Sequence, residues 1–149
     1  MDGVKDNVQE RINAPEYKAI IFELKTLVDS RSAFLPTEVD NRKVGLFQSL
    51  RQRDVKIAVC SMAPQQIVSL CLEKLGLRNF ACVILSADDI THPKPDPEIY
   101  RKAAGALGVD LKECVIVEIA SDGAQAAQNA APGLFVMVDG PEDITEVLF

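Results

Sequence analysis

The 149-residue sequence contains 16 lysines and arginines against 22 aspartates and glutamates, which gives a net charge of −6. This length suits a single domain, and a 48% share of hydrophobic residues is enough to build one core. An acidic chain lacks the dense basic surface that binds phosphate backbones, so we expect no nucleic-acid partner. No apolar run in the sequence approaches the ~20 residues that span a bilayer, so we expect no membrane span.

The first 16 residues precede every strand-like segment and are predicted to form an N-terminal extension. Val4, Val8 and Ile12 recur at helical spacing, which favours a short helix that docks on the domain through one apolar stripe.

Five short apolar runs, rich in Val and Ile, follow the extension and predict strands. Because polar residues do not alternate within them, both faces of each strand are expected to be buried, as in a parallel sheet. The runs are Lys18–Phe22, Val55–Cys60, Ala81–Leu85, Cys114–Val117 and Leu134–Val138.

Segments with helical periodicity separate these runs. The expected helices are Arg42–Arg53, Gln65–Leu75, Asp96–Leu107 and Ala124–Ala131. In the second of them, the residues predicted to form the buried face are Ile67, Leu70, Cys71 and Leu75. Strands that alternate with helices predict an α/β fold: a single doubly wound, Rossmann-like domain over residues 17–149. Its five-stranded, mainly parallel sheet is expected to carry helices on both faces.

The four cysteines are expected to be buried, reduced thiols, because none forms a Cys-x-x-Cys pair. Free thiols favour an intracellular, reducing compartment: the cytoplasm, or an organelle matrix if a transit peptide has been removed. The cysteines are Cys60, Cys71, Cys82 and Cys114.

Chemically active side chains follow the predicted strands, at the edge where such sheets bind ligands. A lysine and a hydroxyl suit a bound phosphate, whereas carboxylates suit Mg²⁺ or act as nucleophiles. The candidates in chain order are Glu23, Lys25, Ser61, Lys94, Glu118 and Asp122.

Ordinary structural roles compete with these chemical ones. Ser61 suits either a phosphate ligand or the N-cap of the following helix. His92 is expected to be a surface residue, and Asp88 and Asp89 are expected to form a turn or cap.

Three stretches in order, VKIAVCSMAPQQIVSLCLEKLGL, KPDPEIYRKAAGALGV and ECVIVEIASDGAQAAQNAAPGLFVMV, resemble the haloacid dehalogenase-like (HAD) hydrolase superfamily. The resemblance is to its β-phosphoglucomutase-like phosphatases and runs from Tyr17 to Val138. It implies that Ser61 and Lys94 bind phosphate. It also implies that Glu23, Glu118 and Asp122 are the residues that would hold Mg²⁺.

The first motif departs from the family pattern. Where the family has a nucleophilic aspartate and an acid/base aspartate, this sequence has Glu23 and Lys25. A glutamate is one methylene longer than the aspartate, and an ammonium is a poor proton donor at neutral pH. A lysine beside the metal position also repels a cation, so we expect Lys25 to replace Mg²⁺ and to pair with Glu23, Glu118 or Asp122.

The segment Arg31–Asn41 is also too short for the helical cap that these relatives insert after the first motif, so a core without a cap domain is expected. We therefore expect a degenerate, inactive phosphatase-like domain that binds another protein or belongs to a larger assembly. One alternative is a capless, Mg²⁺-dependent phosphatase that hydrolyses phosphomonoesters with Glu23 as the nucleophile. A second alternative is a phosphate-sensing module that uses Ser61 and Lys94.

Overall fold

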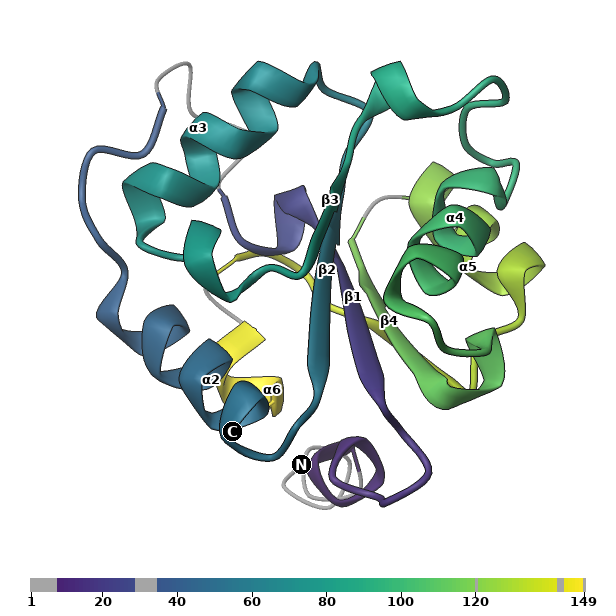
Figure 1. Cartoon of the computed structure of the whole chain (residues 1–149), viewed down its shortest axis with the longest axis horizontal. Coiled ribbons are helices and arrows are strands. Elements are labelled where there is room, and N and C mark those ends of the chain that lie inside the picture. The colour runs from purple at the N-terminus through teal and green to yellow at the C-terminus, as the bar shows by residue number, and fades with distance from the viewer. Residues whose placement is uncertain (1–7, 29–34, 120, 142–143, 149) are drawn as a thin grey trace.

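A five-stranded sheet in the order β3-β2-β1-β4-β5 forms the centre of the computed structural model (Figure 1). The structure describes residues 8–28, 35–119, 121–141 and 144–148. Every pair of neighbouring strands is parallel, which confirms the predicted doubly wound α/β fold. The strands are β1 (Ala19–Glu23), β2 (Lys56–Cys60), β3 (Val83–Leu85), β4 (Cys114–Glu118) and β5 (Leu134–Met137).

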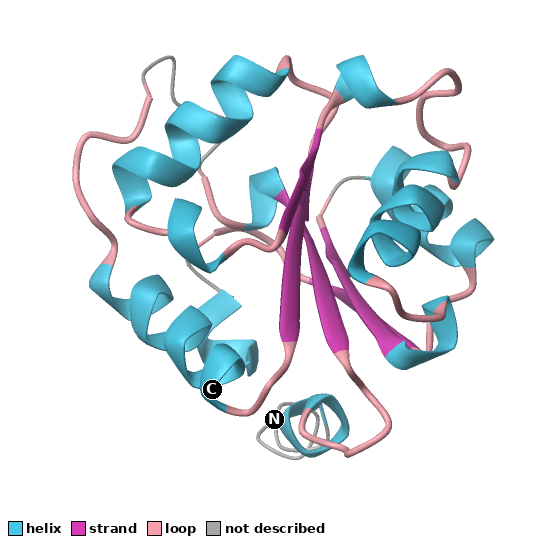
Figure 2. Cartoon of the chain, in the orientation of Figure 1, coloured by secondary structure: helices cyan, strands magenta, loops and turns pink. Residues whose placement is uncertain are grey.

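Helices cover both faces of this sheet, as Figure 2 shows. One face carries α2 (Asn41–Gln52), α3 (Gln65–Leu75) and α6 (Ile144–Leu148). The other face carries α4 (Glu98–Leu107) and α5 (Ser121–Ala130). In the described part of the chain, no helix is long and apolar enough to cross a membrane.

Alternate side chains of β1 supply the two cores. Phe22 enters the larger core under α2 and α3, where its ring stacks on Phe47 with the ring centroids 5.0 Å apart. Ile21 enters the smaller core, which α4 and α5 fill largely with alanines. Small alanine side chains allow these two helices to pack closely on the sheet.

The buried face of α3 differs from the expected one. Cys71 and Leu75 are buried as expected. Ile67, however, is 40% exposed, and Val68 and Leu72 are buried instead. The apolar residues of α3 are numerous enough to support two stripes one residue apart, and the packing of the helix on the sheet selects one of them.

Several boundaries and one cysteine also require correction. β3 begins at Val83, and the preceding Cys82 is exposed, so the prediction that all four cysteines are buried is wrong at this position. α4 begins at Glu98 because Pro97 takes the N-cap position. α6 was not expected from the sequence at all.

The described residues from 8 to 12 are helical, and Ile12 is 3% exposed in the larger core. Val8 packs against the same core, as expected, whereas Val4 lies outside the described residues. The boundary between an extension and a core domain at residues 16 and 17 remains a prediction.

Replacing Phe47 by alanine should lower the free energy of unfolding by about 3–5 kcal/mol, because the substitution removes a fully buried ring from the larger core. Ile67→Ala on the exposed face of α3 is the matched control, with an expected change of about 0.5 kcal/mol or less. Urea unfolding measures both values. Equal losses in the two variants would contradict the assigned face of α3.

Candidate functional site

The predicted site residues meet where the parallel strands end. Glu23 is the last residue of β1, Ser61 directly follows β2, and Glu118 is the last residue of β4. Lys94 reaches them from the loop before α4. A hollow of ≈ 200 Å³ opens here, lined by Glu23, Lys25, Ser61, Met62, Pro93, Lys94 and Gly123.

The Lys94 ammonium lies between two buried carboxylates. It is 2.7 Å from Glu118 Oε2 and 3.6 Å from Glu23 Oε1, and the Lys94 side chain is only 6% exposed. Buried charges of like sign repel strongly unless a cation separates them. Lys94 therefore compensates the charge of Glu118 directly and that of Glu23 in part.

Two further donors hold the Glu118 carboxylate. The Tyr100 hydroxyl donates to Oε2, and the Ile119 N–H donates to Oε1 at 2.9 Å. Burial, and then the nearby Glu118 charge, raise the pKa of Tyr100, so the phenol keeps the proton that it donates. Sequence reasoning missed Tyr100. Its only signal was a polar-tipped aromatic residue on the buried face of the predicted helix.

Glu23 is 3% exposed, and burial raises its pKa above the ordinary 4.5. Lys94 opposes this rise, and the Glu118 charge adds to it. The Lys25 N–H donates to Glu23 Oε2 at 3.0 Å, and Thr26 Oγ1 donates to the Glu23 carbonyl oxygen at 2.7 Å. The turn η1 (Leu24–Thr26) thus holds both the side-chain carboxylate and the backbone carbonyl group of Glu23.

The Lys25 side chain does not take the place that we expected for it. Lys25 is exposed at the rim of the hollow, and no described residue forms an ion pair with its ammonium. Lys94 forms the pairs with Glu23 and Glu118 instead. In the turn η1, the Lys25 N–H donates to Glu23 while the Lys25 side chain is exposed.

Ser61 is 4% exposed, and its Oγ accepts a hydrogen bond from the Ala63 N–H at 3.1 Å. Pro64 occupies the N-cap of α3, so the capping role considered for Ser61 is wrong. The hydroxyl keeps its own proton to donate. The neighbouring Cys60 stays a neutral thiol, because burial raises its pKa strongly.

A parallel α/β core with a serine and a lysine at its carboxyl edge is the arrangement that the sequence resemblance implied. The sequence-family model of the haloacid dehalogenase-like hydrolases matches residues 4–131 of this chain. The chain belongs to this family.

Two curated relatives show the extent of the match. A haloacid dehalogenase-like hydrolase domain-containing protein of Arabidopsis thaliana is 41% identical over 91 residues, which cover 58% of this chain and 28% of the relative. The validoxylamine A 7′-phosphate phosphatase of Streptomyces hygroscopicus subsp. limoneus is 34% identical over 90 residues, which cover 60% of this chain and 41% of the phosphatase. The chain thus spans less than half of the length of each.

Solved structures share the fold of this chain. β-Phosphoglucomutase from Clostridium difficile superposes with a TM-score of 0.69 at 15% identity, covering 86% of this chain and 93% of that chain. CbbY from Rhodobacter sphaeroides, in complex with phosphate, superposes with a TM-score of 0.68 at 16% identity. The superposition covers 83% of this chain and 87% of CbbY. At these identities the two likenesses show a shared fold, which agrees with the predicted α/β core.

The described residues of this family member do not fit a magnesium ion as they lie. Each carboxylate oxygen at the site already faces a donor: Lys94 and the Lys25 N–H at Glu23, and Lys94, Tyr100 and the Ile119 N–H at Glu118. Mg²⁺ takes oxygen ligands in a near-ideal octahedron, and here it would have to displace Lys94. Among the described side chains, no group of three His, Cys, Asp or Glu could hold a metal. Asp122 lies in the first turn of α5, and its side chain lies outside the described ones.

Gly123 allows α5 to approach the site closely. A Cβ at this position would collide with the carboxylate of Glu118. This glycine lines the hollow beside the residues that the sequence predicted.

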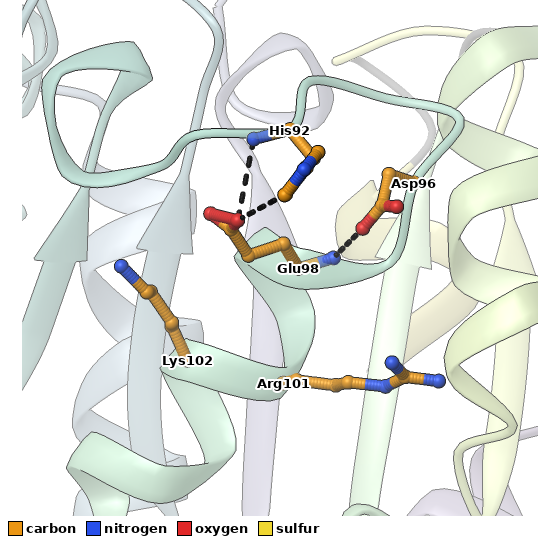
Figure 3. A pocket seen from close by; sticks show the side chains of 5 residues that line it. All are labelled: His92, Asp96, Glu98, Arg101 and Lys102. Atoms are coloured by element: carbon orange, nitrogen blue, oxygen red, sulfur yellow. Dashed lines mark hydrogen bonds and ion pairs between the residues drawn. The ribbon is translucent and has the colours of Figure 1, made fainter.

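A second, shallower hollow of ≈ 440 Å³ lies beside the loop that carries Lys94, and Figure 3 shows its lining residues. The His92 ring points to Glu98, with Nδ1 3.0 Å from Oε1, and is 69% exposed, as expected for a surface residue. Glu98 also accepts from the Thr91 N–H at 2.7 Å, which holds the pKa of Glu98 below 4.5. Glu98 thereby anchors the loop that leads to Lys94.

Asp88 and Asp89 form a cap, as predicted. The Asp89 carboxylate accepts from the Ser86 N–H at 2.8 Å, in a reciprocal capping box with that serine. Asp88 accepts from the Gln65 N–H at 3.2 Å, at the start of α3.

Replacing Gly123 by alanine should lower the free energy of unfolding by about 1–3 kcal/mol, because the added methyl group must push the Glu118 carboxylate away from Lys94. Gly105→Ala in α4 is the matched control. No atom lies within 4 Å of its added Cβ, so a gain of about 0.5–1 kcal/mol is expected. Urea unfolding of both variants tests the prediction. A gain in both would contradict the close approach at Gly123.

Replacing Glu23 by glutamine should make the stability of the folded protein less sensitive to rising pH. A carboxyl group whose pKa is raised in the folded state favours folding below its unfolded pKa of about 4.5. That contribution is lost as the pH rises from 4.5 through the raised value, because the buried carboxyl must then ionise. Melting temperatures of both proteins between pH 4.5 and 8 test this. Parallel curves would show that Glu23 does not titrate in this way.

Proposed function

We propose that this chain is the core of a phosphatase that hydrolyses phosphate monoesters. The observation that carries the proposal is the meeting of the Glu23 carboxylate, the Ser61 hydroxyl and the Lys94 ammonium at one hollow. A hydroxyl and an ammonium are the donors that bind a phosphoryl group, and a carboxylate is a known nucleophile toward phosphorus. The validoxylamine phosphatase among the relatives supports the reaction class.

In this reaction, Glu23 attacks phosphorus and forms an acyl phosphate while the ester oxygen leaves with the bonding electrons. Lys94 and Ser61 stabilise the negative charge on the phosphoryl oxygens. Water then hydrolyses the acyl phosphate and regenerates Glu23. Because Lys25 is a poor proton donor, the reaction should favour leaving groups that need no proton, such as phenolates.

A second candidate is a phosphate-binding module without turnover. It is supported by Lys25 at the position of the family's acid/base residue, and by the donors that already occupy the oxygens of Glu23 and Glu118. Such a module would present its bound phosphate group to another protein or to a larger assembly.

Hydrolysis of an aryl phosphate, with Mg²⁺ or with EDTA, decides between the two. Active protein should lose at least 100-fold in kcat upon Glu23→Gln or Lys94→Ala, in line with the loss of a nucleophile or of charge stabilisation at phosphorus. Lys74→Ala, at an exposed lysine in the last turn of α3, is the control and should keep full turnover.

Turnover that survives Glu23→Gln would remove Glu23 as the nucleophile. Absence of turnover in the unmodified protein, under both conditions and with folding verified by circular dichroism, would refute the phosphatase and favour the binding module.

A further inference from the structure

Two lysines with different surroundings line the hollow at the carboxyl edge. The Lys94 ammonium is buried between Glu118 and Glu23, where most of its charge is compensated. The Lys25 ammonium is exposed at the rim and is paired with no described carboxylate.

The two ammonium groups therefore differ in what they can offer to a ligand. Lys94 is held by Glu118 at 2.7 Å and by Glu23 at 3.6 Å, so its charge is largely compensated within the protein. Lys25 adds a positive charge without a described partner to the same hollow, beside the Ser61 hydroxyl. An uncompensated ammonium at a hollow attracts an anion without help from a metal ion.

We propose that this hollow binds a phosphate group without a divalent cation, and that Lys25 is the binding residue that replaces the cation. This inference rests on the phosphate site of the proposed function and adds to it the role of Lys25. The oxygens of Glu23 and Glu118 already face donors, so no described carboxylate is free to hold a cation beside the phosphate.

The backbone makes Lys25 suitable for this role. Its N–H donates to Glu23 Oε2 at 3.0 Å, which fixes the backbone, while the side chain is exposed and lines the hollow. An ammonium has three donors and can bind phosphoryl oxygens together with Lys94 and Ser61, which line the same hollow. The ligand is then held by donors alone.

Isothermal titration calorimetry with inorganic phosphate tests the proposal, in EDTA and at constant ionic strength. We expect the unmodified protein to bind phosphate in EDTA, with an affinity that Mg²⁺ changes less than twofold. Lys25→Met should weaken binding about tenfold, the loss expected for one charge-assisted hydrogen bond. Lys25→Arg should restore most of the affinity, and Lys74→Met is the control that should leave it unchanged. A second titration with phenyl phosphate shows whether the site takes free phosphate or a monoester.

Binding that requires Mg²⁺, or Lys25→Met that binds as tightly as Lys74→Met, would overturn the proposal. Lys25 is exposed, so its variants should fold, and their melting temperatures without phosphate verify this. Failure of the proposed function looks different: phosphate binding in EDTA that depends on Lys25, without turnover, would remove only the phosphatase. Turnover that requires Mg²⁺ and ignores Lys25 would remove only the present inference.

Discussion

The contact of the Lys94 ammonium with Glu118 and Glu23 is the interaction on which the site depends. Two carboxylates end neighbouring strands of one sheet, and both are nearly inaccessible to water. Without a cation between them, at least one would have to take up a proton or move out of the core. Lys94 allows both to remain there, and the loop before α4 brings it to them.

The surroundings of Glu118 follow from this contact. Tyr100 and the Ile119 N–H complete the hydrogen bonds of the carboxylate, so that no oxygen is left without a donor. α5 can begin immediately above it only because Gly123 has no side chain. The site is therefore preorganised by α4, α5 and β4 together, a property that anion binding and catalysis at phosphorus both require.

The first motif sets this chain apart from the pattern of the family to which it belongs. Glu23 keeps a carboxylate at the end of β1, but Lys25 brings a positive charge to a position where the family has an acid. The structure moves that charge to the rim instead of into the carboxylate pair. This arrangement keeps the hollow accessible and changes its charge from negative toward positive, which is the physical basis for considering anion binding apart from hydrolysis.

The sequence by itself determined the sheet, since five apolar runs without polar alternation are stable only when helices cover both of their faces. It also determined that Glu23, Ser61, Lys94 and Glu118 share one edge, because parallel strands all end on the same side. Only the tertiary structure decided which lysine enters the carboxylate pair. The charges of Lys25 and Lys94 are identical in the sequence, and the choice depends on side-chain directions: the turn η1 directs Lys25 to solvent, whereas the loop before α4 directs Lys94 inward. Tyr100 and Gly123 joined the site for the same reason, because α4 and α5 bring them there through packing that spacing along the chain does not reveal.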